Sequence, residues 1–232
     1  MFVKLMEDRF LNSNENYESN DDYFDIHKLE NDFFYNEKVD NFLSEKVGKY
    51  SNGGVIFLEF PSEKYFDMII ATLKYLTNNG YQGIYVSFQR PYNNILMQFE
   101  KNNINITKLS IVDCASVLNN EPVSENDRFI NISKPFDIDN LVDSISLSLT
   151  KADNINRFII VDSITTLSLF KSEFETKKFS ELLIDNIQRD NIGNTIIIFN
   201  VAIELSKKQY IRDISIHADE KINLLDYMKK SN

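Results

Sequence analysis

The stretch GGVIFLEFPSEKYFDMIIATL, residues 53–73, has the form of a buried strand, a tight turn and an amphipathic helix. A large class of proteins holds the phosphates of ATP at such a turn. Glycines there let backbone N–H groups point inward, a lysine neutralises charge, and a hydroxyl binds Mg²⁺. In this sequence no glycine lies between Phe60 and Ile69, and Tyr65 stands where a hydroxyl is needed after Lys64. The first question is therefore whether this turn binds a nucleotide.

The charges around this turn argue against a phosphate. Glu59 and Glu63 are expected to repel a polyphosphate, by about 1 kcal/mol per charge pair at 4 Å in water and by ~4 kcal/mol at an effective dielectric of 20. Glu63 in the first turn of a helix also satisfies the helix dipole. Ser62 is a good capping residue, so a capped helix start explains PSEK without any ligand. We favour that interpretation.

Other reaction chemistries find little support in the sequence. His27 and His217, the two histidines, follow no metal-ligand spacing, so no metal site is expected. Cys114 has no basic neighbour to lower its pKa and is interpreted as a small buried residue. Neither a G-x-S-x-G elbow nor a G-x-G-x-x-G dinucleotide motif is present. The basic pairs Lys207-Lys208 and Lys229-Lys230 are typical of solvated surfaces.

Composition limits the classes of partner. The chain has 232 residues, a formal net charge of −10 and one cysteine. An acidic chain gains little from counterion release, so nucleic-acid binding is not expected. The start of the sequence lacks the pattern of a signal peptide, and no apolar run approaches the ~20 residues of a membrane span. We therefore expect a cytoplasmic protein that has no contact with membranes.

Apolar runs alternate with amphipathic segments along most of the chain. Strands are predicted over 55–60, 83–88, 109–112, 158–161 and 195–199, with a short extra strand over 129–132. Helices are predicted to start near Ser62 and Pro91 and to cover 137–150 and 175–190, whereas 218–230 fits strand, helix or both. Continuous apolar strands separated by helices indicate a mostly parallel sheet covered on both faces, an α/β three-layer sandwich. Ligands of such sheets bind at the carboxyl ends of the strands.

Three regions are expected in the chain. Residues 1–26 are acidic and predicted to be flexible, residues 27–50 form an amphipathic helix and linker, and residues 51–232 form the α/β domain. The apolar side chains of the helix recur at intervals of three and four residues, which is typical of a helix packed on its own domain. The same helix could instead dock onto another protein.

The order of these segments resembles the RecA superfamily, within it the KaiC/RadA-like branch common in archaea. The matching segments are GGVIFLEF with the following helix, GIYVSFQRPYNNIL, LSIVDCAS, RFIIVDSITTL, NTIIIFNV and HADEKINLL. The resemblance covers roughly residues 50–226. It implies a RecA-like fold with an N-terminal helical extension, a tendency to form rings or filaments, and ATP binding in active members.

The resemblance assigns roles to few residues. Lys64 alone could stand in for the phosphate-binding lysine. After the second strand, where active relatives carry acidic residues, this chain has Gln89 and Arg90. Asp162 and Ser163 match the strand-end pair that supports Mg²⁺, although the same two residues are also ordinary helix caps. Asp113 and Asn200, at other strand ends, have the same two interpretations.

Our leading hypothesis from the sequence is a non-catalytic RecA/KaiC-like protein. It would be a pseudo-ATPase that binds no cofactor and acts as a regulatory, scaffold or adaptor subunit. It would contact a protein partner, as a homodimer or ring or with an active relative. The candidate contact residues are Phe33, Phe34, Tyr65, Gln89, Arg90 and Tyr92. One alternative is a divergent ATPase that binds ATP and Mg through Lys64, Asp162 and Ser163. Another is a sensor of a small ligand in the vacated cleft.

Overall fold

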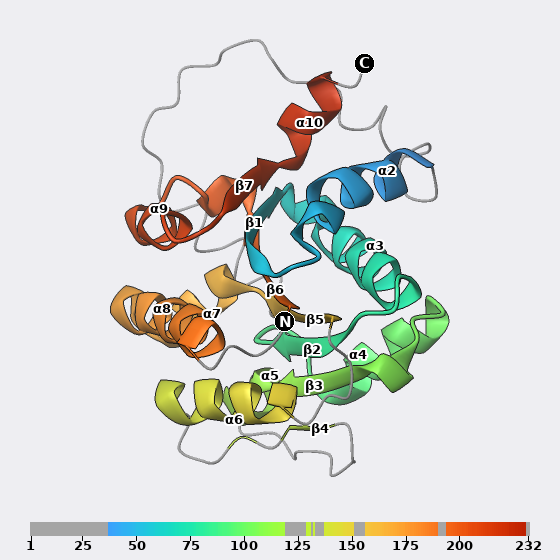
Figure 1. Ribbon diagram of the computed structural model, residues 1–232. Coiled ribbons are helices and arrows are strands. Elements are labelled where there is room, and N and C mark those ends of the chain that lie inside the picture. The colour runs from blue at the N-terminus through green and yellow to red at the C-terminus, as the bar shows by residue number, and fades with distance from the viewer. Residues whose placement is uncertain are drawn as a thin grey trace. The chain divides into compact units, whose positions relative to one another are not determined.

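The core of the protein is a parallel β-sheet, seen edge-on between helices in Figure 1. The computed structural model describes residues 37–118, 129–130, 132, 137–150, 156–189 and 194–230. In this part of the chain seven strands pair in the order β4-β3-β2-β5-β6-β1-β7, and every pairing is parallel. Their bounds are β1 Gly54–Phe60, β2 Gln82–Ser87, β3 Leu109–Asp113, β4 Phe129–Ile130, β5 Asn156–Asp162, β6 Asn194–Ala202 and β7 Glu220–Asn223.

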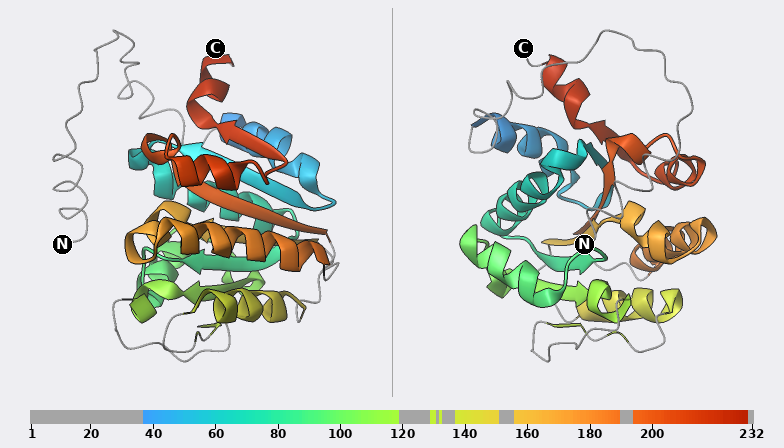
Figure 2. Two further views of the ribbon diagram at one scale, coloured as in Figure 1. Left: turned by 90° about the vertical axis from the view of Figure 1, so that its left-hand side faces the viewer. Right: turned by 180° about the vertical axis from the view of Figure 1, so that it is seen from behind.

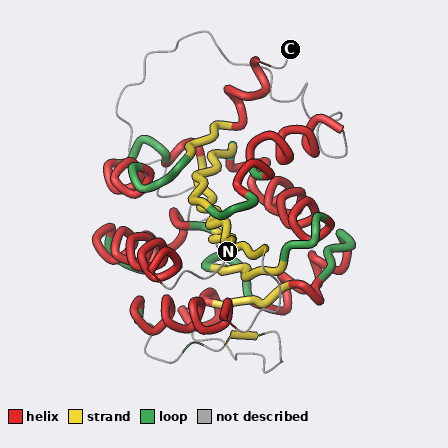
Figure 3. The backbone as a smooth tube through the Cα atoms, in the orientation of Figure 1, coloured by secondary structure: helices red, strands yellow, loops and turns green. Residues whose placement is uncertain are grey.

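Helices cover both faces of the sheet, as Figures 2 and 3 show. The α-helices of the described part are α2 Glu37–Lys46, α3 Tyr65–Asn78, α4 Tyr92–Lys101, α5 Cys114–Leu118, α6 Ile138–Thr150, α7 Ile164–Phe170, α8 Glu173–Arg189, α9 Gln209–Ser215 and α10 Leu224–Lys230. Short 3-10 turns lie at Gly48–Tyr50 (η2), Ser62–Lys64 (η3), Ile106–Lys108 (η4) and Ile203–Leu205 (η5). The three-layer α/β sandwich predicted from the sequence is confirmed.

Each face of the sheet has its own apolar layer, because successive side chains of a strand point to opposite faces. One layer joins Val55 and Phe57 of β1 to α6, α8 and α9. The other layer lies under α3 and α4 and includes Leu58 of β1 and Tyr85 of β2, both fully buried. At Gly83 an added Cβ would lie 2.3 Å from the carbonyl oxygen of Phe158, so only glycine lets β2 and β5 pair this closely.

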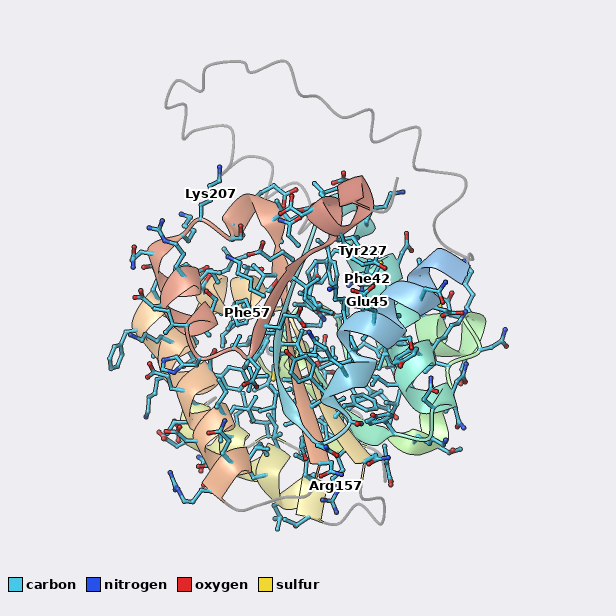
Figure 4. All side chains as sticks on the ribbon, turned by 45° about the horizontal axis from the view of Figure 1, so that its top comes forward. Phe42, Glu45, Phe57, Arg157, Lys207 and Tyr227 are labelled. Atoms are coloured by element: carbon cyan, nitrogen blue, oxygen red, sulfur yellow. The ribbon has the colours of Figure 1, made fainter. Side chains whose placement is uncertain are left out.

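The described part of the predicted N-terminal helix packs on its own domain. Val39, Phe42 and Leu43 of α2 are buried. The ring of Phe42 meets Tyr227 of α10 edge-on, with centroids 4.7 Å apart, and the Tyr227 hydroxyl donates to Glu45. Figure 4 shows these three side chains together. Residues 1–36, which include Phe33 and Phe34, lie outside the described residues.

The strand and long-helix predictions agree with the structure to within a few residues. The segment 218–230 forms both a strand, β7, and a helix, α10. The short helices α5, α7 and α9 were not predicted. Among the described residues, none of the helices combines the length and the hydrophobicity that a membrane span requires.

Candidate functional site

The turn after β1 is short and holds a carboxylate of the chain itself. Pro61 leads directly into η3, and α3 begins at Tyr65. Ser62 does not cap this helix, so that prediction was wrong. Its N–H and its hydroxyl instead donate to the two carboxylate oxygens of Glu204, at 3.2 and 2.8 Å. Glu204 lies in η5, after the neighbouring strand β6, so an internal anion occupies two donors at the start of this helix.

Glu59 does not lie at this turn, which corrects the expectation that it would repel a phosphate there. Its side chain points to the face of the sheet opposite Leu58, because neighbouring residues of a strand alternate. One carboxylate oxygen lies 2.8 Å from the Lys221 ammonium of β7, and the other accepts from the Asn223 amide at 3.2 Å. Glu63, by contrast, is exposed on η3.

Asp162, at the end of β5, is fully buried at the centre of the site. Its Oδ2 accepts a hydrogen bond from the hydroxyl of Tyr85, and a guanidinium nitrogen of Arg90 lies 4.0 Å away. Burial raises the pKa of Asp162, while the hydrogen bond from Tyr85 and then the charge of Arg90 partly offset this rise. The carboxylate is therefore held by protein groups and is shielded from water.

Tyr65 closes the same cluster from α3. Its ring packs against Phe60 with centroids 6.1 Å apart, and its hydroxyl is buried near Asp162 and Ser163 without a hydrogen bond of ordinary geometry. Burial and, next, the charge of Asp162 raise the pKa of Tyr65 well above the usual value. The residue that follows Lys64 thus directs a phenol at the strand-end aspartate.

Arg90 approaches the cluster from the loop after β2. Its guanidinium carbon lies 4.0 Å from the ring centroid of Phe66, a cation–π contact. The Ser87 hydroxyl fixes the loop, since it accepts from the Arg90 N–H at 3.0 Å and donates to the Arg90 carbonyl at 2.9 Å. Gln89 is exposed beside it. The loop therefore connects β2 to α4 and also places Arg90 beside Asp162.

Two other strand-end residues act as caps. Ser163 accepts from the Thr166 N–H at 3.1 Å and caps α7, and the Asp162–Ser163 peptide bond before it is cis. Asp113 accepts from the Ser116 N–H and from the Tyr92 N–H, both at 2.8 Å, so it fixes the starts of α5 and α4 together. The cap interpretation therefore fits Ser163 and Asp113 but does not fit Asp162.

Asn200, which was expected at a strand end, lies inside β6, because this strand continues to Ala202. It pairs in register with Leu58, and the residue before it pairs with Val161, which places it beside Asp162. Asn200 is buried, and neither atom of its amide has a hydrogen-bond partner among the described residues. The Tyr65 hydroxyl and Asp162 Oδ1 are unpartnered in the same way. The strand ends thus enclose a small polar interior rather than an open anion cradle.

Comparison with known proteins identifies the family. A model of the family described as "ATPase: KaiC" matches residues 70–224, well over half of the chain. The chain belongs to the KaiC family of ATPases. The matched span begins inside α3, so it includes Asp162 and Arg90 but leaves out the turn after β1. No curated protein matches the chain.

Comparison with solved structures finds similar chains at low sequence identity. Uncharacterized protein PH0321 from Pyrococcus horikoshii, crystallised with an unknown peptide, has a TM-score of 0.62 at 10% identity, covering 79% of this chain and 82% of that one. KaiC-like protein PH0186 from Pyrococcus horikoshii OT3 has a TM-score of 0.51 at 17% identity, with 74% and 72% covered. Flagellar accessory protein FlaH from Methanocaldococcus jannaschii has a TM-score of 0.46 at 18% identity, with 78% and 76% covered.

The residues predicted to contact a partner differ in exposure in this KaiC-family chain. Tyr65 and Tyr92 are buried and offer little area to a partner, whereas Gln89 is exposed and Arg90 half-buried. Lys64 is half-buried at the start of α3. A role in protein contact stays a prediction for Tyr65, Tyr92, Gln89 and Arg90, and a role in ATP binding stays a prediction for Lys64.

The structure describes the surroundings of Cys114 and His217 in this KaiC-family chain. Cys114 is buried, and burial first and Asp113 second raise the pKa of its thiol well above the usual value. His217 is exposed beside Glu181, and His27 lies outside the described residues. The described residues contain no group of three or more histidine, cysteine, aspartate or glutamate side chains that could hold a metal ion.

Sequence reasoning missed Tyr85 and Glu204. Tyr85 lies inside an apolar strand, where its ring is expected in the hydrophobic core. Nothing in the sequence indicates that its hydroxyl reaches Asp162 on the neighbouring strand β5. Glu204 follows β6 in a segment without a motif. The available signal was topological: β6 lies between β1 and β5, so residues after β6 must pass beside the turn after β1.

Proposed function

We propose that this KaiC-family protein does not hydrolyse ATP and acts as a regulatory, scaffold or adaptor subunit through contacts with other proteins. The observation that carries the proposal is the state of Asp162, a buried carboxylate that accepts from Tyr85 and has Arg90 beside it. In the family pattern this aspartate supports Mg²⁺ through water. Here its charge is already shared with protein donors.

Magnesium chemistry fits these surroundings poorly. Mg²⁺ needs octahedral oxygen ligands at about 2.0–2.1 Å and keeps several waters, so it needs room around the carboxylate. Tyr65 fills the position of the Mg²⁺-binding hydroxyl with a large ring, and that ring is packed against Phe60. A bound Mg²⁺ would also lie near the positive charge of Arg90, which is 4.0 Å from Asp162. Binding would require the cluster to open.

Phosphate binding would meet a second obstacle at the turn after β1. A phosphate there would have to displace Glu204 from the N–H and hydroxyl of Ser62. The turn contains no glycine, so its backbone cannot easily adopt the angles that direct several N–H groups at one anion. These two features argue against tight binding of a nucleotide at this turn.

Protein contact is the activity that remains supported. The solved neighbour PH0321 is described in complex with an unknown peptide, which indicates that this fold can hold a polypeptide. In our chain the loop with Gln89 and Arg90 is accessible at the strand ends. The partner would be a second copy, as a dimer or ring, or an active RecA-like relative. Light scattering over a concentration series, alone and with candidate relatives, tests this.

Calorimetric titration with Mg-ATP tests the loss of nucleotide chemistry. We expect no binding in the micromolar range and no phosphate release by the wild-type protein. Lys64→Ala is the variant that reports on a residual phosphate site, and Lys207→Ala, at an exposed lysine outside it, is the matched control. Micromolar binding that is lost in Lys64→Ala and kept in Lys207→Ala would refute the proposal.

That refuting result would establish the alternative of a divergent ATPase, in which ATP and Mg are bound through Lys64, Asp162 and Ser163. Membership of an ATPase family favours this alternative. A small-ligand sensor is favoured by a different observation, the unpartnered polar atoms of Tyr65, Asp162 and Asn200. Bound density among these three side chains in a crystal of the purified protein would support it.

A further inference from the structure

Several polar atoms at the centre of the site are buried without a hydrogen-bond partner. Nine buried side-chain nitrogen or oxygen atoms of the described residues make no hydrogen bond, and four of them belong to Tyr65, Asp162 and Asn200. The exposed fractions of these three residues are 8%, 0% and 1%. Two of the other atoms, on Glu59 and Glu220, take part in ion pairs with lysines. Because a buried polar atom without a partner destabilises a fold, four of them in one place indicate a bonded guest.

The three side chains point into one part of the interior. Asp162 and Asn200 each follow a residue of one register pair of β5 and β6, so they are neighbours on adjacent strands. Asp162 accepts from Tyr85, which lies in the layer under α3 and α4. Asn200 pairs with Leu58, which lies in the same layer, so both side chains point to this face of the sheet. Tyr65 begins α3 on this face, where burial and then the charge of Asp162 raise the pKa of its hydroxyl. We call the space among Tyr65, Asp162 and Asn200 the polar interior.

The charges around the polar interior favour a neutral guest. Asp162 Oδ2 accepts from the Tyr85 hydroxyl, and a guanidinium nitrogen of Arg90 lies 4.0 Å from the same oxygen. The positive charge of Arg90 offsets the carboxylate, so an added ion would leave a net charge in a buried place, which is costly. The other oxygen, Oδ1, makes no hydrogen bond to a described residue and is the atom that a guest would contact.

The same atoms define the hydrogen bonds that a guest must make. The oxygens of Asp162 and Asn200 need donors, the Asn200 amide nitrogen needs an acceptor, and the Tyr65 hydroxyl can serve either way. We propose that the polar interior binds a small neutral molecule that both donates and accepts hydrogen bonds, either water or an organic molecule of the same chemistry. Such a guest specifies the class of ligand for the small-ligand alternative, and its binding does not depend on whether the protein hydrolyses ATP.

A crystal structure of the purified full chain, grown without small organic additives, tests the site directly. We expect electron density within hydrogen-bond distance of Asp162 Oδ1 and of the Asn200 amide. A single rounded peak with about three polar neighbours identifies water. Extended density, together with an added mass in native mass spectrometry, identifies an organic guest. The absence of density in the polar interior, or a metal ion there, would overturn the proposal.

Substitution of Asn200 tests the site in solution. Asn200→Leu keeps a side chain of similar size and removes both polar atoms of the amide. If the amide holds a guest, the equilibrium constant for unfolding in urea should rise about tenfold. If the amide bonds to nothing, the loss of two buried polar atoms should leave this constant unchanged or lower it. Ser146→Ala is the matched control, because it removes a buried hydroxyl of α6 that has no hydrogen bond to a described residue, and it should change the constant less than about threefold.

A second substitution separates loss of a guest from a steric cost of leucine. Tyr65→Phe removes one hydroxyl of the polar interior. Because both substitutions weaken the same guest, the combined effect on the unfolding constant should be about threefold smaller than the product of the separate effects. Independent effects of the two substitutions, or an Asn200→Leu protein as stable as the wild type, would overturn the proposal. ATP hydrolysis by the same preparation would instead defeat the non-catalytic function and leave the result on the guest intact, so the two failures are distinguishable.

Discussion

Replacing Tyr85 by phenylalanine should destabilise the protein by an amount that depends on the charge of Asp162. The change removes the hydroxyl that donates to Asp162 Oδ2 and keeps the buried ring, which packs edge-on against Phe99. A hydrogen bond to a charged group contributes about 1.5–3 kcal/mol, and one between neutral groups about 0.5–1.5 kcal/mol. We therefore expect a loss of about 2 kcal/mol in the free energy of unfolding at neutral pH.

The pH dependence follows from the raised pKa of Asp162. Because the folded state binds this proton more tightly than the unfolded state, the contribution of Asp162 to stability is largest below its unfolded pKa of about 3.9 and falls as the pH rises through the folded pKa. The hydrogen bond from Tyr85 lowers that folded pKa. Tyr85→Phe therefore raises it further, and the cost of the substitution grows as the pH rises through the folded pKa of Asp162 in the wild type.

Urea unfolding of a double-mutant cycle measures this coupling at neutral pH. Tyr85→Phe is compared in the wild type and in Asp162→Asn, where the carboxylate charge is gone, and the two costs should differ by about 1 kcal/mol. Tyr81→Phe is the matched control, because its hydroxyl makes no hydrogen bond to a described residue, and it should cost less than about 0.5 kcal/mol. Equal costs of Tyr85→Phe in both backgrounds would refute the role given to Asp162.

Two further predictions concern packing. Gly83→Ala places a methyl group 2.3 Å from the Phe158 carbonyl oxygen, so it should cost about 1–3 kcal/mol in urea unfolding. Gly80→Ala, with a φ of 87° and open space around it, should cost only about 1 kcal/mol, and a larger loss there than at Gly83 would contradict the packing argument. Since burial raises the pKa of the Cys114 thiol, a thiol reagent should label it slowly at neutral pH until the protein unfolds; rapid labelling of the native chain would show that the thiol is exposed.

The sheet was predictable because its strands are uninterrupted apolar runs in the sequence. Residues 55–60 and 158–161 are buried on both faces, so their hydrophobicity does not depend on register, and they match β1 and β5 closely. The cap predicted at Ser62 was wrong because the serine hydroxyl and N–H donate to a distant carboxylate, that of Glu204. The rules for helix caps consider only residues close in sequence, so they do not predict such a long-range partner.

The candidate site was less predictable because its contacts join neighbouring elements that lie far apart in the sequence. Tyr65, Tyr85 and Asp162 come from three separate elements, and only the pairing of β2 with β5 and the position of α3 bring them together. Glu59 is a different case. The alternation of side chains along β1 already places it on the face opposite Leu58, so its distance from the turn could have been deduced from the strand prediction alone.

The strand order has a consequence for synthesis on the ribosome. β1 lies near the start of the domain, yet its two neighbours are β6 and β7, and the hydrogen bond from Val55 to Asp219 joins positions 164 residues apart. An emerging chain therefore carries β1 as an unpaired apolar segment until nearly the whole domain has left the exit tunnel. Closure of the sheet waits for the last strands, so we expect the domain to fold slowly and to expose β1 during translation.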